Sequence, residues 1–144
     1  MSAIPFTDRE LKRAWREHAV FCVSGGNQRG ASHRLLLFYA VECGLKVVWL
    51  KRRGRTCFGA DDIARVGHDL RRMLRELRVA GSFSLSENLL LDPIRCNRNK
   101  AQRACKSSDL HQVWRYGGKC VAPTDFECEQ QLRKILNWID GELK

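Results

Sequence analysis

Apolar residues recur at helical spacing along most of the chain. Leu11 and Trp15 begin the first apolar stripe, and Thr7 with Glu10 ahead of them fits a capping box. In such a box the Thr and Glu side chains each bond a free backbone N–H at the start of a helix. The pattern predicts a first helix that begins behind Thr7 and stops at the glycines at 25 and 26.

The segment 31–51 is apolar around most of its circumference, which is typical of a helix in the centre of a bundle. A parallel strand at 46–50 is the competing interpretation, but the helical period continues through these residues and favours a helix. Glu42 and Lys46 lie one helical turn apart inside this segment. They form either an ion pair on its least buried edge or a polar group held inside the bundle to orient a site.

Two further long helices are predicted, one from the apolar residues between 63 and 77 and one behind a second capping box, Thr124 and Glu127. Three less regular segments lie between them: a short helix at 88–91 limited by Pro93, a loop or frayed helix at 95–109, and a short helix at 110–116. No segment alternates polar and apolar residues over the length of a convincing strand. The sequence therefore predicts an all-α fold, with one domain (1–144) built as a bundle of four main helices plus short helical segments.

Charge adds a candidate function to this helical pattern. The chain has 26 Lys and Arg residues against 16 Asp and Glu residues, a formal net charge of +10. Basic residues gather in two clusters, which can neutralise phosphates or can simply be solvated surface. The candidate nucleic-acid-binding residues are Lys51, Arg52, Arg53 and Arg55 in the first cluster and Arg95, Arg98, Lys100, Arg103 and Lys106 in the second. Scattered Arg and Lys do not distinguish RNA from DNA.

Other features exclude several classes of protein. The seven cysteines are an odd number without a repeated short spacing, so we expect no disulfide framework. The apolar stretch 35–50 contains charges and is shorter than the ~20 residues that cross a bilayer, and the first residues lack the order of a secretory signal. We therefore expect a cytoplasmic protein with no membrane partner. Cys96, Cys105, His111 and Cys120 lack the tight pairs of a zinc site, and residues 24–30 lack the Gly-Lys-Ser/Thr ending of a phosphate loop, so no metal or other cofactor is predicted.

Three segments resemble a known family. The segment 33–46 looks like the second helix of HEPN domains, 67–74 looks like their next helix, and Trp114-Arg115-Tyr116 resembles a short motif ahead of their last helix. HEPN domains are helical modules of prokaryotic toxin–antitoxin and antiviral defence systems. The resemblance implies a helical bundle, a homodimer, and metal-independent RNA cleavage by an Arg-x4-6-His motif.

The chain departs from that motif. Arg115 stands near the expected place, but no His follows it, and Arg103 lies too far before His111. A literal match, Arg13 with His18, lies on the first predicted helix, where a buried structural histidine is the alternative. His68 beside Asp69 is a further candidate, with a surface histidine as its alternative. The candidate catalytic residues are Arg13, His18, His68 and Arg115.

Three functional hypotheses follow. The first is a non-catalytic accessory protein that binds nucleic acid in a prokaryotic defence or toxin–antitoxin setting. The second is a metal-independent endoribonuclease with a rearranged Arg/His site. The third is a structural subunit that docks a larger defence enzyme through helix packing, with its positive charge incidental.

Overall fold

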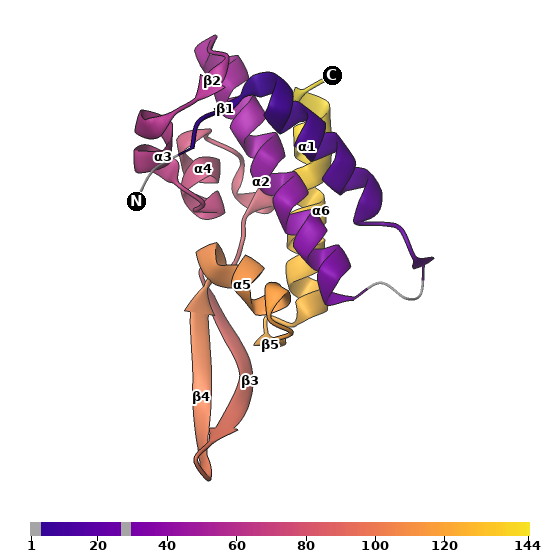
Figure 1. The fold of residues 1–144 in the computed structure, drawn as a ribbon, viewed down its shortest axis with the longest axis vertical. Coiled ribbons are helices and arrows are strands. Elements are labelled where there is room, and N and C mark those ends of the chain that lie inside the picture. The colour runs from indigo at the N-terminus through magenta and orange to yellow at the C-terminus, as the bar shows by residue number, and fades with distance from the viewer. Residues whose placement is uncertain (1–3, 27–29) are drawn as a thin grey trace.

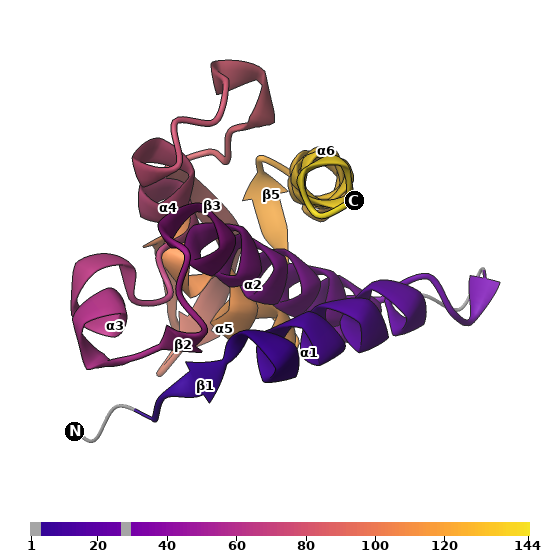
Figure 2. The same cartoon turned by 90° about the horizontal axis from the view of Figure 1, so that it is seen from above.

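Three long helices form the main body of the protein (Figures 1 and 2). In the computed structural model, which describes residues 4–26 and 30–144, α2 (Ala31–Arg53) packs against both α1 (Asp8–Phe21) and α6 (Asp125–Glu142). The central position of α2 confirms the prediction from its apolar circumference, and the competing strand at 46–50 is wrong. Residues 27–29 of the connection between α1 and α2 lie outside the described part.

Both predicted capping boxes are present. The Thr7 hydroxyl accepts a hydrogen bond from the backbone N–H of Glu10, whose carboxylate accepts one from the N–H of Thr7. Thr124 and Glu127 repeat this arrangement at the start of α6. The helix starts that the sequence predicts are therefore confirmed, although α1 ends at Phe21, ahead of the two glycines.

The long helices approach one another closely at Gly44 of α2. A Cβ atom at this position would lie 2.8 Å from a side-chain carbon of Ile139 on α6 and 3.0 Å from the indole of Trp15 on α1. Any larger residue would force these helices apart, because the interior is close-packed. Gly44 thus fixes how near α1 and α6 come to the middle of α2.

The predicted third long helix is wrong. Two short helices replace it, α3 (Ala60–Val66) and α4 (Leu70–Glu76), and Gly67 separates them with a φ of +54° that helical residues do not adopt. Asp69 then caps α4 by accepting a hydrogen bond from the backbone N–H of Arg72 at 3.2 Å. The break leaves His68 between the two helices, in the connection rather than on a helix face.

The all-α prediction is also wrong, because the described residues form two antiparallel sheets beside six α-helices. In the larger sheet, β3 (Asn88–Cys96) lies between β4 (Asn99–Lys106) and β5 (Cys120–Ala122). The smaller sheet pairs β1 (Phe6–Thr7) with β2 (Cys57–Phe58). The fold is therefore mixed α/β. The helix expected at 88–91 is part of β3, and most of the loop or frayed helix expected at 95–109 is the rest of the same hairpin.

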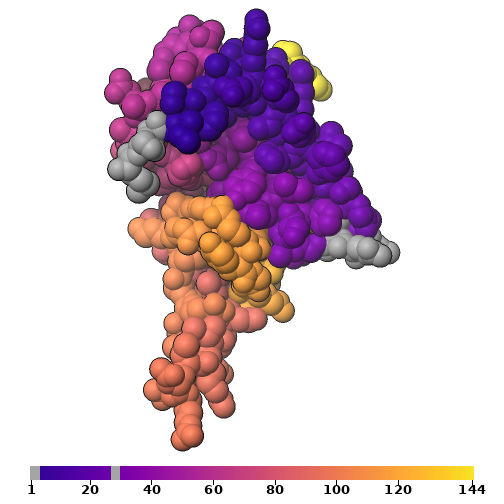
Figure 3. Space-filling model, in the orientation of Figure 1, coloured from indigo at the N-terminus to yellow at the C-terminus, as the bar shows by residue number. Residues whose placement is uncertain are grey.

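The hairpin projects from the body of the protein (Figures 1 and 3). Only its base is anchored, by Leu89 and Leu91, whose side chains are buried while Leu90 between them is exposed. Pro93 lies at a register shift between Leu91 and Ile94, which is where a strand tolerates a proline. From residue 95 to residue 102 the side chains are exposed, so these positions carry no pattern of burial that a sequence could show.

The short helix α5 (Leu110–Arg115) is confirmed and connects the hairpin to the body. The indole N–H of Trp114 donates a hydrogen bond to the Asp125 carboxylate at the start of α6, at 3.0 Å. Two 3₁₀ helices, η2 (Gly81–Phe83) and η3 (Ser107–Asp109), flank the strands of the hairpin. Within residues 4–26 and 30–144, no helix has the length and apolar character needed to span a membrane.

Candidate functional site

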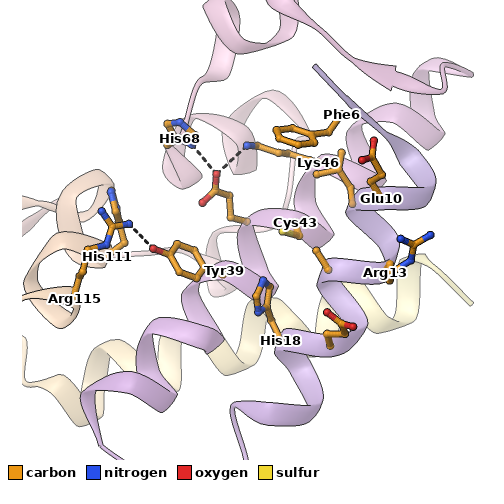
Figure 4. Close-up of a pocket in the computed structure, with 14 residues that line it drawn as sticks. Phe6, Glu10, Arg13, His18, Tyr39, Cys43, Lys46, His68, His111 and Arg115 are labelled. Atoms are coloured by element: carbon orange, nitrogen blue, oxygen red, sulfur yellow. Dashed lines mark hydrogen bonds and ion pairs between the residues drawn. The ribbon is translucent and has the colours of Figure 1, made fainter. Parts of the chain in front are cut away.

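A cavity of about 760 Å³ lies among α1, α2, α5 and the connection between α3 and α4 (Figure 4). All four candidate catalytic residues from the sequence line it, namely Arg13, His18, His68 and Arg115. The structure therefore gathers at one place residues that are more than a hundred positions apart in the chain. The cavity also holds further titratable side chains: Glu10, Glu17, Glu42, Lys46 and His111.

Glu42 is the ionic centre of this cavity. Its carboxylate accepts a hydrogen bond from Lys46 at 2.8 Å and lies 2.7 Å from Nδ1 of His68, although Glu42 is only 9% exposed. Burial raises the pKa of the Glu42 carboxyl, but the contacts with His68 and Lys46 outweigh that effect and the net pKa is lowered. Glu42 and Lys46 thus form the ion pair of the first sequence interpretation, but the pair is largely buried and lines a cavity.

His68 presents one ring nitrogen to Glu42 and the other toward solvent. The side chain is 70% exposed, and Nε2 makes no hydrogen bond with any residue that the structure describes. The broken helix at Gly67 makes this orientation available, since the imidazole extends from an irregular connection toward α2. A carboxylate bound to one nitrogen fixes the orientation of the ring and compensates its charge when both nitrogens are protonated.

His111 and Arg115 enter the cavity together from α5. They are four residues apart on one helix face, and Arg115 donates a hydrogen bond to the hydroxyl of Tyr39. Nδ1 of His111 is buried without a hydrogen-bond partner among the described residues, and the ring packs against Phe38 at 5.3 Å between centroids. Burial lowers the pKa of His111, and the charges of Arg115 and His68 lower it further against the opposite effect of Glu42. His111 is therefore a neutral imidazole at neutral pH.

Arg13 and His18 lie across the cavity on α1 (Figure 4). His18 is half-buried, with its ring 5.8 Å from that of Tyr39, and burial lowers its pKa. Arg13 is exposed at the rim. Cys43 also reaches the cavity, but burial raises the pKa of its thiol to about 11, so it is not an activated nucleophile at neutral pH.

Sequence reasoning missed the pairing of His111 with Arg115. The motif of the resembling family has its Arg ahead of its His, and Arg103 lies too far before His111 to fit it, so the sequence assigns His111 no arginine partner. The sequence does contain a signal for this pair. His111 precedes Arg115 by four residues, and this spacing places both side chains on one face of a helix. Tyr39, which fixes Arg115, gave no signal because its partner lies on a distant element.

The first basic cluster makes structural contacts. Lys51 donates a hydrogen bond to the Glu142 carbonyl at 2.9 Å, and Arg52 pairs with the Glu142 carboxylate at 3.6 Å. The guanidinium of Arg53 lies 3.2 Å from the ring centroid of Trp49. Arg55 donates to both carboxylate oxygens of Asp62, at 2.7 and 2.6 Å. These contacts fasten the end of α2 to α6 and α3. The C-terminal end of α2 lies at the opposite end of the molecule from the hairpin (Figure 1).

The second basic cluster lies on the projecting hairpin. Arg95, Arg98, Lys100 and Lys106 are exposed, and their side chains make no hydrogen bond or ion pair with a described residue. Arg103 nearer the base donates to the carbonyl of Asp92 at 2.9 Å. The four exposed cations are therefore available to an anionic partner, unlike those at the end of α2.

The remaining candidates for chemistry do not gather. Among residues 4–26 and 30–144, no group of three or more His, Cys, Asp or Glu side chains is placed to hold a metal ion, and the seven cysteines form no disulfide bond there. The histidines of the cavity can instead transfer protons, and its arginines are cations that can bind a phosphate.

The resemblance to HEPN domains stays a prediction, since no protein-family model, curated protein or solved structure matches the chain.

Proposed function

We propose that the cavity is the active site of an endoribonuclease that cleaves RNA through the ribose 2′-hydroxyl without a metal ion. The observation that carries this proposal is the presence in one cavity of His111, Arg115 and a His68 that is bound to the buried carboxylate of Glu42. A non-catalytic binding protein has no need of histidines in such different environments. The geometry therefore favours the endoribonuclease over the non-catalytic hypothesis.

The two histidines divide the proton transfers between them. His111, neutral because its pKa is lowered by burial, accepts the proton of the 2′-hydroxyl, and the 2′-oxygen attacks the adjacent phosphorus. His68, held by Glu42, donates a proton to the departing 5′-oxygen. The contact of Nδ1 with the Glu42 carboxylate leaves Nε2 of His68 as the nitrogen that faces the substrate. The products are a 2′,3′-cyclic phosphate and a 5′-hydroxyl.

Arg115 stabilises the charge that grows on the phosphoryl oxygens. Its guanidinium is fixed by Tyr39, and a fixed cation stabilises developing charge without having to reorganise during the reaction. The pKa of Arg115 is raised by its contact with the Tyr39 hydroxyl and by a second contact with Tyr116, so the group keeps its charge. Arg13 on the opposite wall is placed to hold a neighbouring phosphate.

The basic hairpin supports a second role, the capture of the nucleic acid. Its exposed cations lie on an arm that projects from the base of α5, the helix that carries His111 and Arg115. Such cations bind phosphates without regard to sequence and guide a strand toward the cavity. From the resemblance to HEPN domains we further propose a cytoplasmic role in prokaryotic defence or in a toxin–antitoxin pair.

The test is cleavage of a fluorescently labelled RNA in excess chelator. We expect the protein to cut the RNA, and His68→Ala and His111→Ala each to lower the rate by about 10²-fold or more. His33→Ala is the matched control, because His33 lies at the start of α2 and does not line the cavity. Intact RNA with the unaltered protein, or equal rates for all three variants, would contradict the proposal.

A further inference from the structure

The helix α5 separates the first cavity from a second cavity of about 440 Å³. His111 and Arg115 line the first cavity, whereas Gln112 and Tyr116 line the second. Each pair is spaced by four residues, and the two pairs are one residue out of step, so they occupy adjacent faces of the helix. One short helix therefore forms a wall of both cavities.

The second cavity combines an aromatic face with polar groups. Tyr116 is 79% exposed, an unusual state for so large a side chain, and Leu91 and Val113 supply apolar surface beside it. Gln112 and Asp109 offer a hydrogen-bond donor and acceptors. This combination of a stacking surface and a few polar groups is typical of sites that bind an unpaired nucleobase.

Two glycines keep the second cavity open. Gly117 adopts a φ of +76° and Gly118 donates a hydrogen bond to the carbonyl of Val113 at 2.7 Å, so the chain turns tightly behind α5. A Cβ atom at Gly118 would lie 3.0 Å from the side chain of Val113. This wall is therefore bare backbone, and no side chain from it fills the space.

Arg115 and Tyr116 link the two cavities. Arg115 lines the first cavity and the next residue in the chain, Tyr116, lines the second, so one peptide bond separates the cation from the aromatic residue. A phosphate bound by Arg115 would thus have Tyr116 within reach of the nucleoside attached to it. Arg103 of the basic hairpin also lines the second cavity.

We infer that the second cavity binds the unpaired nucleobase next to the scissile phosphate, by stacking on Tyr116 with the base edge toward Gln112 and Asp109. The inference rests on the proposed function for the position of that phosphate. It names the substrate class as single-stranded RNA, because a paired base cannot leave its stack to enter the cavity without a cost in unpairing.

The test measures binding of a labelled six-nucleotide RNA that cannot be cleaved, because every 2′-hydroxyl is replaced by fluorine. A second probe lacks one base, and fluorescence anisotropy gives the affinity of each. We expect Tyr116→Ala to weaken binding of the intact probe by about 5- to 100-fold, the range for loss of one stacked base. Tyr116→Phe should retain the affinity, because it keeps the ring.

The abasic probe separates stacking from a general loss of binding. The unaltered protein should bind it more weakly than the intact probe by a similar factor, whereas Tyr116→Ala should bind both probes alike. Phe126→Ala is the matched control, because Phe126 is a 63% exposed aromatic residue that lines neither cavity. A duplex RNA of the same length should compete poorly.

The outcomes separate this inference from the proposed function. If the unaltered protein binds neither probe, or binds both equally, or if Tyr116→Ala binds like the unaltered protein, the nucleobase site is wrong even when RNA is cleaved. If the stacking signature is present but natural RNA is never cleaved, the nucleobase site stands and the nuclease proposal fails.

Discussion

The carboxylate of Glu42 and Nδ1 of His68 lie 2.7 Å apart, although they belong to different elements of the fold. Glu42 comes from the middle of the central helix α2, and His68 comes from the break between two short helices. The pairing therefore depends on tertiary structure. It fixes the ring that we assign as proton donor and keeps Nε2 directed toward solvent.

Replacing Glu42 by Gln tests this relationship. The variant keeps the shape of the side chain but removes the charge that compensates an imidazolium at His68. We expect kcat for RNA cleavage to fall by about 10²-fold while KM changes little. Far-ultraviolet circular dichroism should be unchanged. A variant that cleaves at the original rate would show that Glu42 has no part in the chemistry.

Stability should depend on pH through two half-buried histidines. Burial lowers the pKa of His18 and His111 below the ordinary value of about 6.5, so the unfolded chain takes up protons first as the pH falls. The stability that these neutral rings contribute is present above that value and is lost below it. Urea unfolding at about pH 7.5 and about pH 5.5 should show a fall for the unaltered protein and a smaller fall for the His18→Gln/His111→Gln variant. An equal fall in both would contradict this assignment.

A second ionic contact should contribute to stability without contributing to catalysis. Asp62 is 3% exposed and accepts hydrogen bonds from Arg55, Trp49 and the backbone N–H of Gly59. Burial alone would raise the pKa of Asp62, but these bonds outweigh it and lower the pKa to about 2.

Asp62→Asn should therefore destabilise the fold by about 2–3 kcal/mol at neutral pH, because Arg55 loses its charged partner. The difference from the unaltered protein should shrink as the pH falls from about 4 toward 2, where the carboxylate is protonated. Chemical denaturation over that range measures it. A difference that stays constant with pH would contradict the role of the charge.

The two basic clusters should respond differently to substitution. Replacing Arg95, Arg98 and Lys100 by Ser removes exposed cations without intramolecular partners among the described residues, so nucleic-acid affinity should fall and stability should not. The slope of log affinity against log salt should become shallower by about 0.7 for each phosphate of a single strand that the variant no longer neutralises.

The matched control is Lys51→Ala/Arg52→Ala. It also lowers the net charge, but it removes bonds to Glu142, so it should lower the melting temperature and change the salt slope less. Gel-shift titration at two salt concentrations and thermal unfolding distinguish the two results. An equal fall in affinity for both variants would mean that net charge alone attracts the nucleic acid.

Local signals in the sequence predicted the helix starts and the central helix. Thr7 and Thr124 cap their helices through residues three positions away, and such short-range pairs can be read directly from the chain. The strand β3 could not be predicted in this way. Its buried positions are few, Pro93 interrupts them, and residues 95–102 are exposed on both faces, so burial does not alternate in the outer part of the hairpin.

The candidate site was predictable in its parts but not in its arrangement. Arg13, His18, His68 and Arg115 could be named from their residue types, yet nothing in the sequence places them around one cavity. His68 reaches it because Gly67 breaks a helix that the apolar spacing predicts to be continuous. The pairing of His111 with Arg115 was not predicted because this histidine precedes its arginine, whereas the motif in the resembling family has the arginine first.

The most direct test of the proposed active site uses a DNA oligonucleotide that contains a single ribonucleotide, incubated with the protein in excess chelator and analysed by mass spectrometry. We predict one cut, on the 3′ side of the ribonucleotide, with a 2′,3′-cyclic phosphate on one product. His68→Ala and His111→Ala should abolish the cut, and His33→Ala should retain it. Three results would contradict the account: an uncut oligonucleotide, cleavage of the all-DNA control, or cleavage by His68→Ala and His111→Ala at the rate of the unaltered protein.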